Sequence, residues 1–173
     1  MRRSAVGRGG PPVDTRHMPA NAPTQEPVTC SPSCEAALRR DPVVWMSSVQ
    51  VDGRPHVVPV WFHWDGERIV AFSKPHARKI ENLRGMPRVM LAVGMPGPDF
   101  EVELIEATAE IPAAPAAAIM PAGFAAKYRD LLTRAGLTAQ RFAEMYSQPI
   151  VLRPTRFLGY GGRGWDRSGS FAT

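Results

Sequence analysis

The sequence has too little of several features to belong to some large classes of protein. Its 173 residues contain no apolar run of about 18 residues or more, the length that a membrane-spanning helix needs. The first residues, MRRSAVGRGGPP, contain paired arginines but no apolar segment of the kind found in export signals. We therefore expect a cytoplasmic protein that has no membrane partner.

Cysteine is scarce as well. Only Cys30 and Cys34 occur, and no further cysteine or histidine stands beside them at metal-ligand spacing. A disulfide framework and a zinc site are therefore not expected, and the two thiols are interpreted as ordinary reduced cysteines. No metal ligand is predicted anywhere in the chain.

Motifs for nucleotide binding and nucleophilic catalysis are also missing. The sequence contains no GxGxxG, no P-loop and no recognisable catalytic triad. His63 and His76 are acid–base candidates because histidine titrates near neutral pH, but neither has a recognisable carboxylate, Ser or Cys partner in the sequence. Tyr128 and Tyr146 lie in predicted helices and are interpreted as packing residues. The catalytic residue is therefore left unassigned.

The net charge of +5 is concentrated at the two ends of the chain. Residues 1–34 contribute +2 and residues 153–173 contribute +3, whereas the middle carries 13 cations and 13 anions. A protein that tracks a nucleic-acid backbone would need cations throughout its fold, together with exposed aromatic side chains. No nucleic-acid partner is therefore predicted.

The predicted elements describe one domain over residues 35–160, with a disordered leader over 1–34 and a flexible tail over 161–173. The leader contains six prolines and three glycines and little that could be buried. The turns Asp52-Gly53 and Asp65-Gly66 are typical of tight hairpins. Strands are predicted at 43–50, 56–64, 68–73, 87–95, 101–111 and 149–160, and helices at 34–41, near 75–84, and at 122–133 and 138–146. Short, regularly spaced strands indicate a mainly β fold, a small antiparallel barrel with Greek-key character and peripheral helices.

The segment from Arg68 to Arg88 gathers six cations against one acid. Pro75 suits the first turn of a helix, and Ile80 and Leu83 recur at helical spacing to form its buried stripe. Arg78, Lys79 and Asn82 are left on other faces of this helix, available to solvent or a ligand. Basic side chains at a helix start favour an anion such as a phosphate, because unpaired N–H groups and the helix dipole act in the same direction.

Five segments together resemble a known family. They are DGRPHVVPVWFHWDGERI, SKPHARKIENLRGMPRVML, IEATAEI, AAKYRDLL and PTRFLGY, and they occur in order over about residues 38–160. The sequence is similar to the pyridoxamine 5'-phosphate oxidase-like split β-barrel proteins. More closely, it resembles the deazaflavin-dependent B group of the flavin/deazaflavin oxidoreductases.

The resemblance implies a homodimer that holds its cofactor in a groove between the subunits. In this group the cofactor is usually coenzyme F-420, a deazaflavin with an anionic phosphate and oligoglutamate tail; some relatives use FMN and a few handle haem. Carried over by position, the residues lining the ring would be Val58, Pro59, Val60 and Trp61. The residues holding the phosphate would be Ser73, Lys74, Arg78 and Lys79.

The function that the resemblance implies is hydride transfer. We expect an oxidoreductase that moves a hydride from reduced coenzyme F-420 to a small electron-poor organic substrate. Two alternatives stay open: an FMN-dependent oxidoreductase of the same fold, and a protein that carries F-420 or haem without catalysing a reaction.

Overall fold

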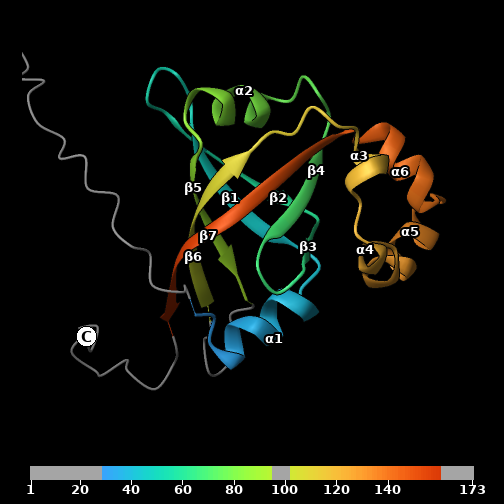
Figure 1. Cartoon of the computed structure of the whole chain (residues 1–173), viewed down its shortest axis with the longest axis horizontal. Coiled ribbons are helices and arrows are strands. Elements are labelled where there is room, and N and C mark those ends of the chain that lie inside the picture. Colours follow the sequence, from blue (N-terminus) through green and yellow to red (C-terminus); the bar gives the residue numbers. More distant parts are fainter. Residues whose placement is uncertain (1–28, 95–101, 161–173) are drawn as a thin grey trace, which may run out of the picture.

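The computed structural model describes residues 29–94 and 102–160, which form one antiparallel seven-stranded sheet curled into a split barrel, with six short helices (Figure 1). The strand order is β2-β1-β5-β6-β7-β4-β3. The strands are β1 Val44–Val49, β2 Pro55–Val60, β3 Phe62–Trp64, β4 Ile69–Ser73, β5 Arg88–Val93, β6 Val102–Glu110 and β7 Gln148–Tyr160. The helices are α1 Pro32–Arg40, α2 Arg78–Gly85, α3 Ala116–Ile119, α4 Ala122–Lys127, α5 Arg129–Arg134 and α6 Ala139–Met145. The predicted split β-barrel is confirmed.

The single strand predicted over residues 56–64 is wrong, because the chain breaks at Trp61. β2 pairs with β1, whereas β3 pairs with β4, so the two segments lie at opposite ends of the strand order. The apolar alternation continues through the break and therefore gives no local sign of it.

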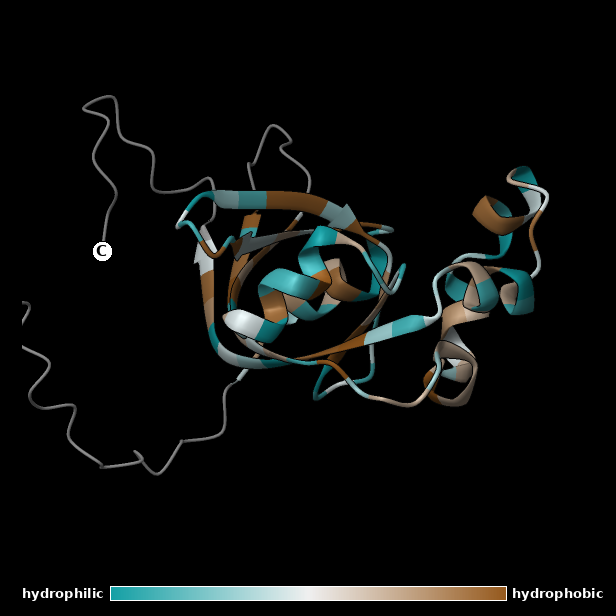
Figure 2. Ribbon diagram, turned by 90° about the horizontal axis from the view of Figure 1, so that it is seen from above, coloured by the Kyte–Doolittle hydropathy of each residue, from teal (hydrophilic) through white to brown (hydrophobic). Residues whose placement is uncertain are grey.

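The barrel is filled by apolar side chains from alternate positions of its strands, as the period of a strand requires. The largest fully buried ones are Met46, Phe62, Ile69, Leu91, Ile105, Ile150 and Leu152. Leu38 of α1 belongs to the same cluster, as do Ile80 and Leu83 of α2, the predicted buried stripe. Each such side chain contributes about 1.5–3 kcal/mol by burial. Seen from above, α2 lies across one end of the barrel with strands around it (Figure 2), and α1 lies at the other end (Figure 1).

Helix α1 begins inside the stretch that was expected to be disordered. Ser31 is its N-cap and accepts a hydrogen bond from Cys34 N at 3.1 Å. Ser31 and Ser33 also donate to Glu103 Oε1 of β6, at 3.3 and 3.1 Å. The cap and these long-range contacts define the helix start at Pro32. Residues 1–28 and 161–173 lie outside the described part of the chain.

The segment between β6 and β7 forms α3 to α6, which stand beside the barrel (Figure 1). Phe72 of β4 contacts Phe124 of α4 edge-on, with ring centroids 5.0 Å apart, in a second apolar cluster. Thr138 caps α6 by accepting from Arg141 N at 3.1 Å. No helix in the described residues is both long and apolar enough to cross a membrane.

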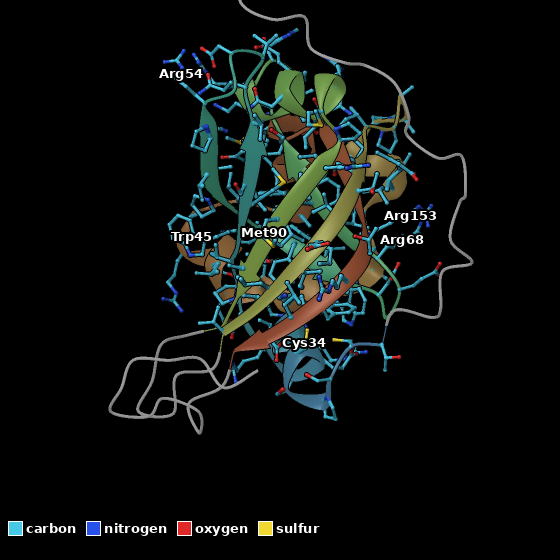
Figure 3. All side chains as sticks on the ribbon, turned by 90° about the vertical axis from the view of Figure 1, so that its left-hand side faces the viewer. Cys34, Trp45, Arg54, Arg68, Met90 and Arg153 are labelled. Carbon is cyan, nitrogen blue, oxygen red and sulfur yellow. The ribbon has the colours of Figure 1, made fainter. Side chains whose placement is uncertain are left out.

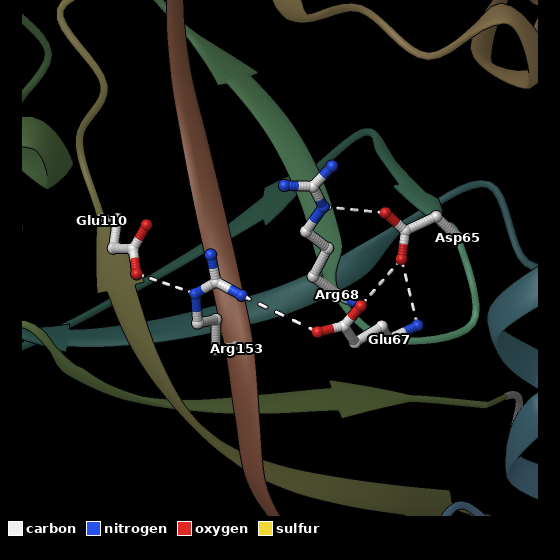
Figure 4. Close-up of polar contacts among 5 residues, drawn as sticks. All are labelled: Asp65, Glu67, Arg68, Glu110 and Arg153. Atoms are coloured by element: carbon white, nitrogen blue, oxygen red, sulfur yellow. Dashed lines mark hydrogen bonds and ion pairs between the residues drawn. The ribbon is translucent and has the colours of Figure 1, made fainter.

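Ion pairs on the outer surface join strands that are distant in sequence. Arg153 of β7 donates to Glu110 Oε1 of β6 at 2.7 Å and lies 4.0 Å from Glu67 Oε1 in the β3–β4 turn (Figure 4). Asp65 and Arg68 pair across the same turn at 2.8 Å. Because these groups are largely exposed, water and salt screen each pair, and the pairs add little to stability.

Candidate functional site

The strongest candidate site lies where the end of β4 meets the start of α2. Ser73 is the last residue of β4 and is 1% exposed. Lys79 Nζ donates to Ser73 Oγ at 3.3 Å, and Ser73 Oγ lies within hydrogen-bond distance, 3.2 Å, of Lys74 O. The structure therefore brings together two of the residues that were predicted to hold a phosphate.

The side chain of Lys79 is suited to receive an anion. It is half-buried, and burial lowers the pKa of Lys79 below its ordinary value. It forms no ion pair with any described carboxylate. A charge that is partly removed from water and has no counter-charge favours a negatively charged ligand, which would restore the pKa.

The start of α2 supplies main-chain donors beside Lys79. Ala77 is the N-cap, and no side chain caps the helix. The N–H groups of Ala77 and Ile80 already donate, to Lys74 O at 3.1 Å and to Ala77 O at 2.8 Å. The donors that remain at the positive end of the helix dipole are the N–H groups of Arg78 and Lys79. The lysine, the serine and these N–H groups together fit a phosphate or a similar anion.

The other two predicted phosphate ligands do not converge on the same point. Arg78 Nη1 donates to Gln50 Oε1 at 2.8 Å, which ties α2 to the hairpin between β1 and β2. Lys74 is exposed, and its side chain forms no hydrogen bond or ion pair among the described residues. Neither of these two side chains takes part in the Ser73–Lys79 contact.

A buried polar group behind α2 was missed by the sequence analysis. Asn82 was expected to be available on an outer face, but it is 7% exposed and donates from Nδ2 to Ser48 Oγ at 3.0 Å. Nearby, His56 Nδ1 is buried and has no hydrogen-bond partner among the described residues. Helical spacing indicates which residues share a face, but it does not reveal that Ser48 of β1 supplies a hydrogen-bond partner for Asn82.

The second part of the site is the outer edge of β2, which ends the strand order. Gln50 N donates to Arg54 O at 2.9 Å, and this contact fixes which residue pairs of β1 and β2 exchange hydrogen bonds. In an antiparallel ladder, pairs that exchange hydrogen bonds alternate with pairs that do not. Gln50 and Arg54 form a bonded pair, so the next residue of β2, Pro55, and every second residue after it are not bonded to β1. Pro55, Val57 and Pro59 therefore turn their main-chain groups away from β1. The two prolines thus stand where no ladder donor is needed.

This free edge has a sparse pattern of donors and acceptors. Proline has no N–H, so Val57 supplies the one outward N–H of this edge. Pro55, Val57 and Pro59 each supply an outward carbonyl. Among the described residues, none of these groups has a strand beside it. A flat heterocycle with complementary edge groups could pair with such an edge, as a further strand does in β-augmentation.

The four residues predicted to line a ring point in different directions. Val58 and Val60 face the barrel interior, where Val60 is 6% exposed, and Pro59 is exposed on the opposite face. The indole of Trp61 stacks on the ring of Tyr128, with centroids 4.5 Å apart and planes 4° apart. These residues share the main-chain edge of β2 and its end, but their side chains do not form one surface.

The two candidate histidines lie apart from the Ser73–Lys79 contact. His63 packs against Gly123 of α4, where an added Cβ would come within 2.4 Å of the imidazole, so glycine is required for the approach. Burial and the nearby Lys127 lower the pKa of His63. His76 is exposed in the turn before α2. His63 therefore serves the packing of a helix on a strand.

A curled antiparallel sheet with a short helix across one end is the architecture of the flavin-binding split barrels. The family model for pyridoxamine 5'-phosphate oxidase matches residues 31–153, which is more than half of the chain. The chain therefore belongs to the pyridoxamine 5'-phosphate oxidase family. No curated protein matches the sequence.

Solved structures agree with this membership. The chain is similar to an F420 reductase at 28% identity and a TM-score of 0.54, covering 72% of this chain and 94% of that one. A conserved hypothetical protein from Mycobacterium tuberculosis is 22% identical, with a TM-score of 0.60 and coverage of 79% and 88%. An FAD-binding protein from Mesorhizobium loti is 20% identical, with a TM-score of 0.52 and coverage of 73% and 89%. The last two likenesses show the fold alone.

Proposed function

We propose that the protein is an oxidoreductase that transfers a hydride from reduced coenzyme F-420 to a small electron-poor organic molecule. The observation that carries the proposal is the pairing of an anion site with a free strand edge. Ser73, Lys79 and the start of α2 suit the phosphate, and the edge of β2 suits the flat ring. Family membership and the 28% identity to an F420 reductase support this choice of cofactor.

The two parts of the site lie on either side of the split in the barrel. Arg78 reaches the β1–β2 hairpin, whereas Lys79 reaches the end of β4. β3 pairs with β4 only as far as Ala71, the partner of Phe62. Ser73 lies two residues further along β4, where no residue of β3 stands beside it. The start of α2 therefore bridges the split, so that one molecule with an anionic handle and a ring could contact both sides.

The residues present would bind and orient the cofactor, whose reduced deazaflavin ring supplies the hydride when bound. Lys79 and Ser73 would hold the phosphate by charge-assisted hydrogen bonds. Val57 N–H and the carbonyls of Pro55 and Pro59 would fix the edge of the ring. Lys74 and Arg78, which border this site, would meet the remaining negative charge of the tail. None of these roles requires proton transfer by a side chain.

We also propose that the protein is a homodimer. The outer face of β1 and β2 exposes large apolar side chains in a place where a solvated sheet face carries polar ones. Trp45 is 53% exposed and Val57 is 54% exposed; Pro59 lies opposite Trp45 in the ladder. Trp45 and Met90 lie on one side of the barrel in Figure 3. Exposed apolar patches of this kind mark interaction surfaces, and a second copy would cover this one beside the β2 edge.

Titration of the purified protein with coenzyme F-420 and with FMN, followed by fluorescence, tests the cofactor. Tight binding of F-420 with no binding of FMN, and oxidation of the reduced form in the presence of quinones or enones, is the expected result. Preference for FMN would support the FMN-dependent alternative. Tight binding of F-420 without oxidation by any acceptor would support a carrier, and binding of neither cofactor would refute the proposal.

A further inference from the structure

Within residues 29–94 and 102–160, the split leaves two strand edges without a neighbouring strand, the edge of β2 and the edge of β3. Asp65 N donates to Arg68 O at 3.2 Å, and this contact fixes the hydrogen-bonding pattern of β3 with β4. Bonded and non-bonded pairs alternate along this ladder as well, so His63 exchanges hydrogen bonds with Val70. Phe62, one residue earlier, belongs to a non-bonded pair and turns its N–H and C=O away from β4. Both main-chain groups of Phe62 therefore point toward the split.

One side chain from the helical segment meets both of these groups. Phe62 N donates to Tyr128 Oη at 2.8 Å, and Tyr128 Oη lies 2.9 Å from the carbonyl oxygens of Phe62 and Pro42. The hydroxyl has one proton, so it donates to one of the two carbonyls at a time. Tyr128 is 0% exposed, and burial raises its pKa, which keeps the hydroxyl protonated. The tyrosine hydroxyl thus replaces the missing strand at the edge of β3.

The same tyrosine also contacts the residue at which the chain crosses from one end of the strand order to the other. Trp61 is the one residue between β2 and β3. Its indole lies parallel to the ring of Tyr128 at 4.5 Å and to that of Phe142 at 5.2 Å. The crossover is therefore held twice, through the main chain of Phe62 and through the side chain of Trp61.

We infer that Tyr128 is a positioning residue for the cofactor-binding edge of β2. By holding Trp61 and Phe62, it fixes the end of the strand on which Val57 and Pro59 present their main-chain groups. The inference rests on the proposed function, and it assigns the segment α3–α6 a part in the site although this segment stands beside the barrel. Loss of the hydroxyl would release the crossover and allow the edge to shift. A pre-organised edge binds a rigid ring more tightly than a mobile one.

The test compares Tyr128→Phe with Tyr146→Phe in the full chain. Both changes remove one hydroxyl from the same helical segment, but Tyr146 stacks on Phe142 and its hydroxyl forms no hydrogen bond with any described residue. Amide hydrogen exchange of the apo protein measures the crossover directly, and titration with coenzyme F-420 and FMN measures the site. Both measurements are made at a temperature well below the thermal unfolding midpoint of each variant, so that global unfolding does not affect the exchange rates or the dissociation constants.

In Tyr128→Phe, the amide of Phe62 should exchange about tenfold faster or more, because it loses its acceptor, and the dissociation constant of the bound cofactor should rise about tenfold. Tyr146→Phe should change neither. Wild-type affinity in Tyr128→Phe, with faster exchange at Phe62, would overturn the inference and leave the proposed function intact. If the wild-type protein binds neither cofactor, the proposed function fails, and this inference fails with it.

Discussion

Replacing Lys79 with alanine should weaken cofactor binding strongly while the fold is kept. The lysine is half-buried, contacts Ser73 Oγ and forms no ion pair with any described carboxylate. Two unit charges about 4 Å apart attract by about 4 kcal/mol at the effective dielectric constant of a protein surface. Part of this attraction is cancelled by loss of water from both groups. A hydrogen bond to a charged group retains about 1.5–3 kcal/mol, which corresponds to an increase of the dissociation constant by about 10-fold to 150-fold.

The matched control is Arg84→Ala. Arg84 is an exposed cation in the last turn of the same helix, so its removal changes the net charge equally but leaves the start of α2 untouched. Fluorescence titration at two salt concentrations should show a large loss of affinity in Lys79→Ala and almost none in Arg84→Ala. Lys79→Arg should recover part of the affinity. Equal losses in both alanine variants would mean that general charge attraction, and not a site at the helix start, holds the ligand.

Three further predictions concern assembly and stability. Trp45→Glu should shift the protein from dimer to monomer in light scattering, because it places a charge in the apolar face of β1; an unchanged mass would exclude this face as the interface. Ser31→Ala should lower the free energy of unfolding by about 1 kcal/mol in urea titration, because the α1 cap is lost. A free energy of unfolding equal to that of the wild type would show that the cap contributes nothing. Lys127 Nζ donates to Leu38 O at 2.9 Å, and burial lowers its pKa to about 8 from 10.5. Between these two pH values the unfolded state binds more protons, so the stability of the wild type relative to Lys127→Met should rise as pH increases through this window. A difference between the two proteins that stays constant with pH would contradict the assignment.

The elements of the fold could be predicted to a large extent because their signals are local. Alternating apolar residues and the Asp-Gly turns indicate the strands, and the spacing of Ile80 and Leu83 indicates the buried stripe of α2. The break at Trp61 could not be predicted in the same way. Both sides of the break have the same alternation, and what changes is the partner strand, which a single segment does not encode.

The site was predicted in part for a similar reason. Ser73 and Lys79 lie six residues apart around a helix start, so the sequence alone brings them near each other. Tyr128 and Asn82 act on groups 66 and 34 residues away, and their partners are set by tertiary packing. The sequence signal for Tyr128 was its place in the segment AAKYRDLL, which pointed to the family but not to a contact with the main chain of Phe62.

The two edges of the split are protected in different ways, and the difference bears on function. An unpaired strand edge attracts other strands, and proteins reduce this tendency by removing donors or by covering the edge. The β2 edge follows the first route, since Pro55 and Pro59 leave Val57 as its only N–H donor between them. The β3 edge follows the second, since the hydroxyl of Tyr128 occupies both main-chain groups of Phe62. The β2 edge is therefore open while the β3 edge is fixed, and under the proposed function this difference would let the split receive a ring without closing on itself.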